Sequence, residues 1–81
     1  MNKQLGMDNI EQRVLLLAIY KSEPNETLQD ILLTLENSKL FDLKTGKKYL
    51  KNLKNLGFIE GSNLTLLGIE EAKQVENEFK L

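Results

Sequence analysis

DLKTGKKYLKNLKNLGFIE, residues 42–60, is the most strongly patterned stretch of this chain. Asp42 is a preferred residue at a helix N-cap, because its carboxylate accepts hydrogen bonds from the free backbone N–H groups of a first turn. Gly57 marks the other end, since a residue without a Cβ most easily adopts the left-handed conformation that stops a helix. The spacing predicts an amphipathic helix over residues 43–56 that leads directly into a short apolar strand. Its apolar or small residues recur three and four positions apart: Leu43, Gly46, Tyr49, Leu50, Leu53 and Leu56.

The opposite face of this predicted helix is basic. Residues 39–54 hold six of the eleven basic residues of the chain and a single acid, and most other acids lie before or after this stretch. Such a distribution can orient a small domain toward a polyanion, although the formal net charge of the chain is -1. The alternative is a lysine-rich face that is simply solvated. The polar residues on this face are Lys44, Thr45, Lys47, Lys48, Lys51, Asn52, Lys54 and Asn55.

Length and composition exclude several classes of protein. The 81 residues are enough for one small domain with a modest core. The chain has neither cysteine nor histidine, so disulfides, thiolate metal sites and the commonest general base are missing. It also lacks a glycine-rich phosphate loop, and its serines have no base to activate them. We therefore predict that the protein is not an enzyme and holds no cofactor, metal or small-molecule ligand.

The sequence shows neither a membrane-spanning segment nor a secretion signal. No apolar run approaches the ~20 residues that span a bilayer, so no membrane partner is expected. Residues 1–7 have neither the apolar core nor the cleavage site of a secretion signal. The prediction is a cytoplasmic protein with a flexible tail at residues 1–8 and a single domain at residues 9–81.

A first helix is predicted after this tail. Asp8 stands three residues before Glu11, which resembles a capping box. The run Ile10–Tyr20 is apolar on more than one face, as is typical of a central helix that is contacted on two sides. The alternative is that this helix exposes an apolar stripe to a partner. Pro24 predicts that the helix ends near Lys21 or Ser22.

A second, shorter helix is predicted before the lysine-rich one. Thr27 can cap it, and Asp30 in its first turn suits the helix dipole. Leu40 and Phe41 provide an apolar filling for the turn that follows. Two short helices joined by a tight turn are in helix-turn-helix order. The apolar residues of the second helix are Leu28, Ile31, Leu32 and Leu35.

A small hairpin and a last helix are predicted to complete the chain. The apolar segments Phe58–Glu60 and Leu64–Leu66 flank a turn at Gly61–Asn63, and such a hairpin must lie against helices to be stable. Thr65 can also cap the last helix, in which Glu70 and Glu71 near the start and Lys80 near the end would suit the dipole. The apolar side of this helix repeats at Ile69, Ala72, Val75 and Phe79.

This order of elements resembles the plan of the winged helix-turn-helix family. Residues 49–59 resemble the end of the family's recognition helix, with its Leu-x-x-Leu-x-x-x-Gly-Phe/Leu-Ile pattern. Residues 64–72 are similar to the family's wing-to-last-helix signature, Leu-Thr-x-x-Gly-x-x-x-Ala. The resemblance covers residues 10–79. It implies a mainly α fold with a small β-hairpin (α+β), built from a three-helix helix-turn-helix core, a short wing and a C-terminal helix.

The resemblance also implies a function. In this family the helix that matches residues 43–56 usually enters the major groove, so the chain is expected to be a small DNA-binding protein and a transcriptional regulator. The partner would be double-stranded DNA, with lysines at phosphates and Thr45 and Asn52 at base edges. The DNA-facing residues carried over from the family are Lys44, Thr45, Lys47, Lys48, Lys51 and Asn52, with Lys54 on the same face.

A second function stays open, because the chain departs from the DNA-binding pattern at the wing. The wing turn carries no basic residue, Glu60 lies at its base, and Arg13 is the one arginine in the sequence. Tight binding by a single copy is therefore not expected without a dimer or a second partner. The alternative is a protein–protein interaction module that docks through the acidic first and last helices or the wing. A homodimer is compatible with both functions.

Overall fold

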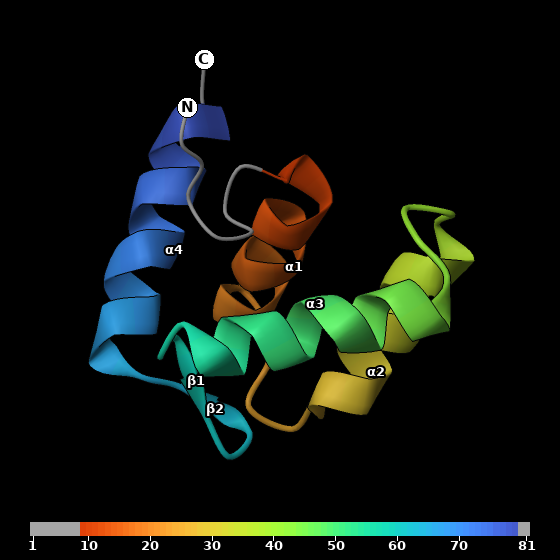
Figure 1. Ribbon diagram of the computed structural model, residues 1–81, viewed down its shortest axis with the longest axis horizontal. Helices are drawn as coiled ribbons and strands as arrows, with labels where there is room; N and C mark the ends of the chain where they lie inside the picture. Colours follow the sequence, from red (N-terminus) through yellow and green to blue (C-terminus); the bar gives the residue numbers. More distant parts are fainter. Residues whose placement is uncertain (1–8, 80–81) are drawn as a thin grey trace.

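The computed structural model describes residues 9–79. Four helices and a two-stranded antiparallel hairpin account for its regular structure (Figure 1), so the predicted class of a mainly helical fold with a small hairpin is confirmed. The proposed tail at residues 1–8 and Lys80 lie outside the described residues. In chain order the elements are α1 (Ile10–Tyr20), α2 (Leu28–Asn37), α3 (Leu43–Asn55), β1 (Ile59–Glu60), β2 (Asn63–Leu64) and α4 (Leu66–Phe79).

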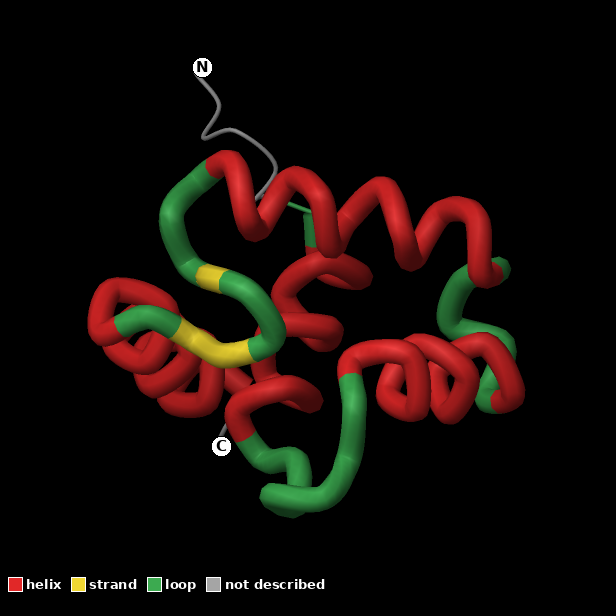
Figure 2. Tube along the Cα trace, turned by 90° about the horizontal axis from the view of Figure 1, so that it is seen from below, coloured by secondary structure: helices red, strands yellow, loops and turns green. Residues whose placement is uncertain are grey.

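Helix α1 is the centre of the molecule, as its apolar pattern predicts. It packs against α2, α3 and α4, and Leu15 and Leu16 in its middle are fully buried. Figure 2 shows α3 as the upper helix that leads into the hairpin, with the other three helices on one side of it. The core around α1 consists of Leu15, Leu16, Ile19, Ile31, Leu32, Phe41, Leu53, Phe58, Ile59, Ala72 and Val75.

The first two helices begin at capping residues. Asn9 caps α1, because its Oδ1 accepts hydrogen bonds from the backbone N–H groups of Glu11 (2.8 Å) and Gln12 (3.3 Å). The expectation that Asp8 caps this helix is therefore wrong by one residue, since either residue type can fill the role and Ile10 is the first helical position. Thr27 caps α2 as predicted, and the Asp30 side chain also accepts a hydrogen bond from the Thr27 backbone N–H, so the two residues form a capping box that the sequence prediction did not include.

Helix α3 has the predicted boundaries to within one residue. The Asp42 carboxylate accepts a hydrogen bond from the backbone N–H of Thr45 at 2.8 Å. The helix ends at Asn55 with Leu56 as its C-cap, and Gly57 follows in the left-handed conformation with φ 86°. Gly46 allows the Phe41 ring to approach, because a Cβ at this position would lie 2.6 Å from the ring atom Cε1.

The hairpin is tighter than the sequence predicts. Ile59 pairs with Leu64 and Glu60 with Asn63, so the turn is Gly61–Ser62 and the predicted three-residue turn is wrong. Gly61 has φ 65°, a conformation that costs little for glycine and lets the chain reverse within two residues.

The second strand also ends earlier than predicted, because Leu66 already belongs to α4. The Thr65 hydroxyl accepts a hydrogen bond from the backbone N–H of Gly68 at 3.0 Å, as expected for a cap. It also donates a hydrogen bond to the Gly57 carbonyl at 2.6 Å. Leu66 is left 76% exposed instead of facing the core. Within residues 9–79, no helix combines the length and apolar character needed to cross a membrane.

Candidate nucleic-acid interface

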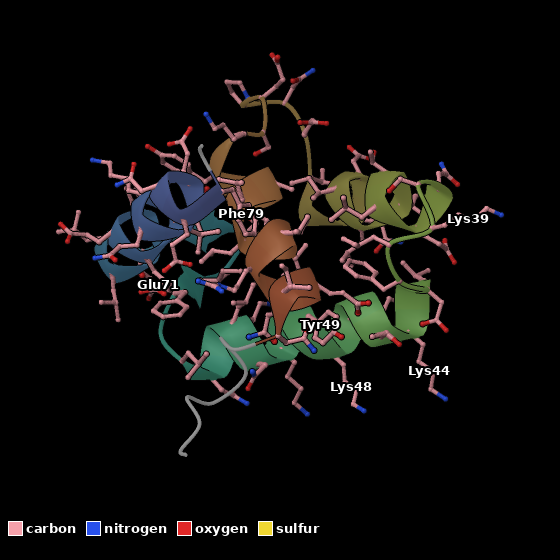
Figure 3. All side chains as sticks on the ribbon, turned by 90° about the horizontal axis from the view of Figure 1, so that it is seen from above. Lys39, Lys44, Lys48, Tyr49, Glu71 and Phe79 are labelled. Atoms are coloured by element: carbon pink, nitrogen blue, oxygen red, sulfur yellow. The ribbon has the colours of Figure 1, made fainter. Side chains whose placement is uncertain are left out.

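Helix α3 forms one edge of the molecule, and its outward side is lined by lysines. Figure 3 shows Lys44 and Lys48 pointing away from the body of the protein along this edge. Among residues 9–79, the ion pairs join α1 or its C-cap to α4, and none involves a lysine of α3. The positive charges on α3 therefore face solvent without an ion pair to any residue in this range. The acid that interacts with them is Asp42 at the helix N-cap, whose pKa is lowered by its hydrogen bond from Thr45 and in part by Lys44. The exposed lysines of this helix are Lys44, Lys47, Lys48, Lys51 and Lys54.

Four residues form a row along the solvent-facing side of α3. Residues 44, 48, 51 and 55 are separated by four, three and four positions, which places them in one row along a helix. This row, which we call the outer stripe, lies on the side of α3 opposite to the buried Gly46 and Leu53. Thr45 and Asn52 flank the stripe on one side and are half-buried. The outer stripe consists of Lys44, Lys48, Lys51 and Asn55.

A polar groove of about 400 Å³ runs beside the outer stripe, between α3 and the start of α1. Four amide side chains contribute to its lining, together with hydroxyl groups and two lysines. It therefore offers both hydrogen-bond donors and acceptors next to positive charge. The lining residues are Asn9, Gln12, Thr45, Lys48, Tyr49, Lys51, Asn52 and Asn55.

One wall of this groove is held by a buried amide. Gln12 is 1% exposed, and its Oε1 accepts a hydrogen bond from Nδ2 of Asn52 at 3.1 Å. The predicted base-edge residue Asn52 is thus tied to α1, and part of its hydrogen-bonding capacity is already used. A buried amide pair of this kind restricts how Asn52 can orient.

Tyr49, which also lines this groove, joins α3 to the first turn of α1. Its hydroxyl donates a hydrogen bond to Oε1 of Glu11 at 2.7 Å and accepts one from Nδ2 of Asn9 at 3.1 Å. The hydrogen bond to the Glu11 carboxylate raises the pKa of Tyr49, because only the protonated phenol can donate it. The rings of Tyr49 and Phe41 pack in a T-shaped arrangement with centroids 5.6 Å apart. Tyr49 is therefore not only a core residue, as its spacing predicts, but also a polar bridge.

The seven predicted site residues all lie on α3, and the structure divides them into two groups. The five lysines are exposed, whereas Thr45 and Asn52 are half-buried at the groove. Asn55 was missed as a site residue, although its place in the 4-3-4 spacing of the outer stripe is a signal that could identify it. Gln12 carries no such signal, because its burial depends on how α1 packs against α3.

The edge of the molecule opposite to α3 is formed by the loop between α1 and α2, as Figures 2 and 3 show. This loop contains Glu23 and Glu26, both exposed. A second hollow of about 390 Å³ lies between this loop and the hairpin, and its lining includes Ile19 and Ile31 from the core. The described part of the chain contains no group of three acidic, histidine or cysteine side chains that could hold a metal ion.

No protein-family model matches this chain, and neither does any curated protein or solved structure. Any function given to the chain therefore depends on its own residues, above all on the lysines and the groove of α3.

Proposed function

We propose that the chain is a small winged-helix DNA-binding protein and transcriptional regulator that contacts double-stranded DNA through α3. The observation that supports this function most is the set of five exposed lysines on one helix, none of which forms an ion pair with another residue of the range 9–79. Lysine is a point charge suited to phosphate oxygens, and such contacts provide most of the affinity of non-specific DNA binding.

The dimensions of α3 fit this role. A helix of 13 residues is about 20 Å long, and the major groove of B-DNA is about 12 Å wide. The acids Glu23 and Glu26 lie on the edge opposite to α3, so the charge distribution would turn the lysine face toward a polyanion.

A single copy would have a small contact surface. The hairpin turn Gly61–Ser62 carries no basic side chain, and Glu60 beside it is exposed and acidic. Modules that bury little surface on DNA usually gain affinity by acting in pairs. We therefore expect a homodimer or a second DNA-binding partner on the natural site.

The test is a titration of the protein with a mixed-sequence duplex at low salt, followed by fluorescence anisotropy and by amide NMR shifts. Lys51→Glu should weaken binding by at least tenfold, because it replaces an attraction to phosphate with a repulsion. Lys73→Glu is the matched control, since Lys73 is exposed on α4 and carries the same charge away from α3. Shifts in wild type should be confined to residues 44–55.

Equal weakening by Lys51→Glu and Lys73→Glu would indicate an unspecific charge effect and contradict a contact surface on α3. Absence of shifts at low salt would contradict DNA binding altogether.

A protein–protein interaction module is the second candidate function, and the hollow beside the hairpin favours it. Its apolar lining from Ile19 and Ile31 lies next to the carboxylates of Glu23 and Glu26, which suits a partner with apolar and basic side chains. Under this function Glu26→Lys would abolish partner binding, whereas Lys51→Glu would leave it unchanged.

A further inference from the structure

We infer that α3 reads A·T base pairs through the amide of Asn55, an inference that rests on the proposed DNA-binding function. Along the outer stripe the other three side chains are lysines, which can only donate hydrogen bonds. Asn55 is the member of the stripe that presents a donor and an acceptor from one planar group. This combination matches adenine, which offers an N7 acceptor and an N6 donor in the major groove.

The amide of Asn55 is open to a ligand, unlike that of Asn52. Asn55 is exposed, and its side chain has no hydrogen-bond partner among the described residues. The Nδ2 group of Asn52 instead donates to the buried Gln12. Both side chains line the groove beside the outer stripe, so a base-pair edge that approaches α3 there would meet a fixed amide and a free one.

Helix α3 carries no arginine, the side chain that most often recognises guanine. The preferred reader of guanine is the arginine fork, which contacts O6 and N7 together. Arg13 lies on α1 and pairs with Glu78 of α4, so its guanidinium serves the contact between these two helices. Lysines of α3 can reach guanine or phosphate, but a single ammonium group does not distinguish them strongly.

Lys48 and Lys51 would hold the phosphates while Asn55 contacts the base. They precede Asn55 by seven and four residues in the same row, so they lie within two turns of it on the same side of α3. All three residues line the groove. This arrangement separates affinity, carried by the lysines, from base preference, carried by one amide.

The experiment compares the affinities of the protein for an A·T-only and a G·C-only duplex of equal length at the same low salt concentration. We expect wild type to bind the A·T duplex about 5- to 100-fold more tightly, the range for one good bidentate contact. Asn55→Ala should remove this preference and leave the salt dependence unchanged, since it removes no phosphate contact. Alanine is compatible with an exposed helical position, and a far-ultraviolet circular dichroism spectrum confirms that the variant folds.

Two controls make the result specific. Asn77→Ala removes an exposed asparagine from α4 and should keep the preference. Replacing adenine by 7-deazaadenine removes the N7 acceptor without changing base pairing, and should reduce wild-type binding to the level of Asn55→Ala.

Equal affinity for the two duplexes would overturn the inference while leaving DNA binding intact. A preference that survives Asn55→Ala or 7-deazaadenine would overturn it as well, because DNA shape would then be the source of the preference. Absence of salt-dependent binding to both duplexes would overturn the proposed function together with the inference.

Discussion

At the scale of single residues, two glycines illustrate different physical constraints. Gly68 lies where α4 passes the backbone of Phe58, and an added Cβ would overlap the Phe58 carbonyl oxygen and lie 2.9 Å from the carbonyl carbon. Gly61 has open space around it but a φ of 65°. The first glycine is required by packing, and the second by backbone conformation.

These constraints predict different costs for the same substitution. Gly68→Ala should lower the free energy of unfolding by about 3 kcal/mol or more, because backbone atoms cannot move aside as a flexible side chain can. Gly61→Ala should cost only about 1 kcal/mol, the penalty for a left-handed non-glycine residue. Urea unfolding followed by circular dichroism measures both values. A smaller loss for Gly68→Ala than for Gly61→Ala would contradict the close approach of α4 to Phe58.

At the scale of elements, the start of α3 depends on one carboxylate. The backbone N–H of Thr45 donates to Asp42, and this hydrogen bond lowers the pKa of Asp42 below its ordinary value of 3.8. The folded-state pKa is therefore below the unfolded one. The contribution of Asp42 to stability is complete above the unfolded pKa and is lost as the pH falls through the lower, folded value.

Two substitutions at this cap separate its charge from its hydrogen bond. Asp42→Ala should destabilise the protein at neutral pH, because it leaves the first turn of α3 without its acceptor. Asp42→Asn should retain most of the stability at neutral pH, since asparagine is also a good N-cap. Below pH 4 this variant should lose less stability than the wild type, because asparagine does not titrate. Thermal unfolding at several pH values tests this. An unchanged acid dependence in Asp42→Asn would show that Asp42 does not cause it.

At the scale of the whole molecule, charge is separated across the short dimension of the fold. The lysine face of α3 and the acidic loop between α1 and α2 occupy opposite edges (Figure 3), while the net charge of the chain stays near zero. A molecule of this kind would bind a polyanion in one orientation and would lose that binding quickly as salt is added.

The number of lysines limits the salt dependence of one bound copy. Each neutralised phosphate lowers log K by about 0.9 per unit of log salt, so five lysines correspond to a slope of about 4.5 at most. Anisotropy titrations on a short duplex between 50 and 200 mM salt measure this slope. A steeper value would show that two copies bind together, and a slope near zero would contradict phosphate contact by α3.

The sequence alone predicts the class of fold and most helix boundaries. Asp42, Thr27 and Gly57 act on their own first or last turns, and helical spacing depends on residues three or four positions apart. These interactions are local, so their pattern is readable without a structure. The lysine face of α3 is predicted for the same reason. The winged-helix family and the DNA partner remain proposals.

Contacts between distant residues were decided only by the tertiary structure. Gln12 is buried and holds Asn52 because α1 packs against α3, forty residues away along the chain. Tyr49 meets Glu11 and Asn9 in the same interface. The groove beside the outer stripe, and with it the difference between the free Asn55 and the tethered Asn52, exists only after α1 and α3 come together. A pattern of nearby residues cannot encode this difference, because the energy of such contacts comes from packing between elements.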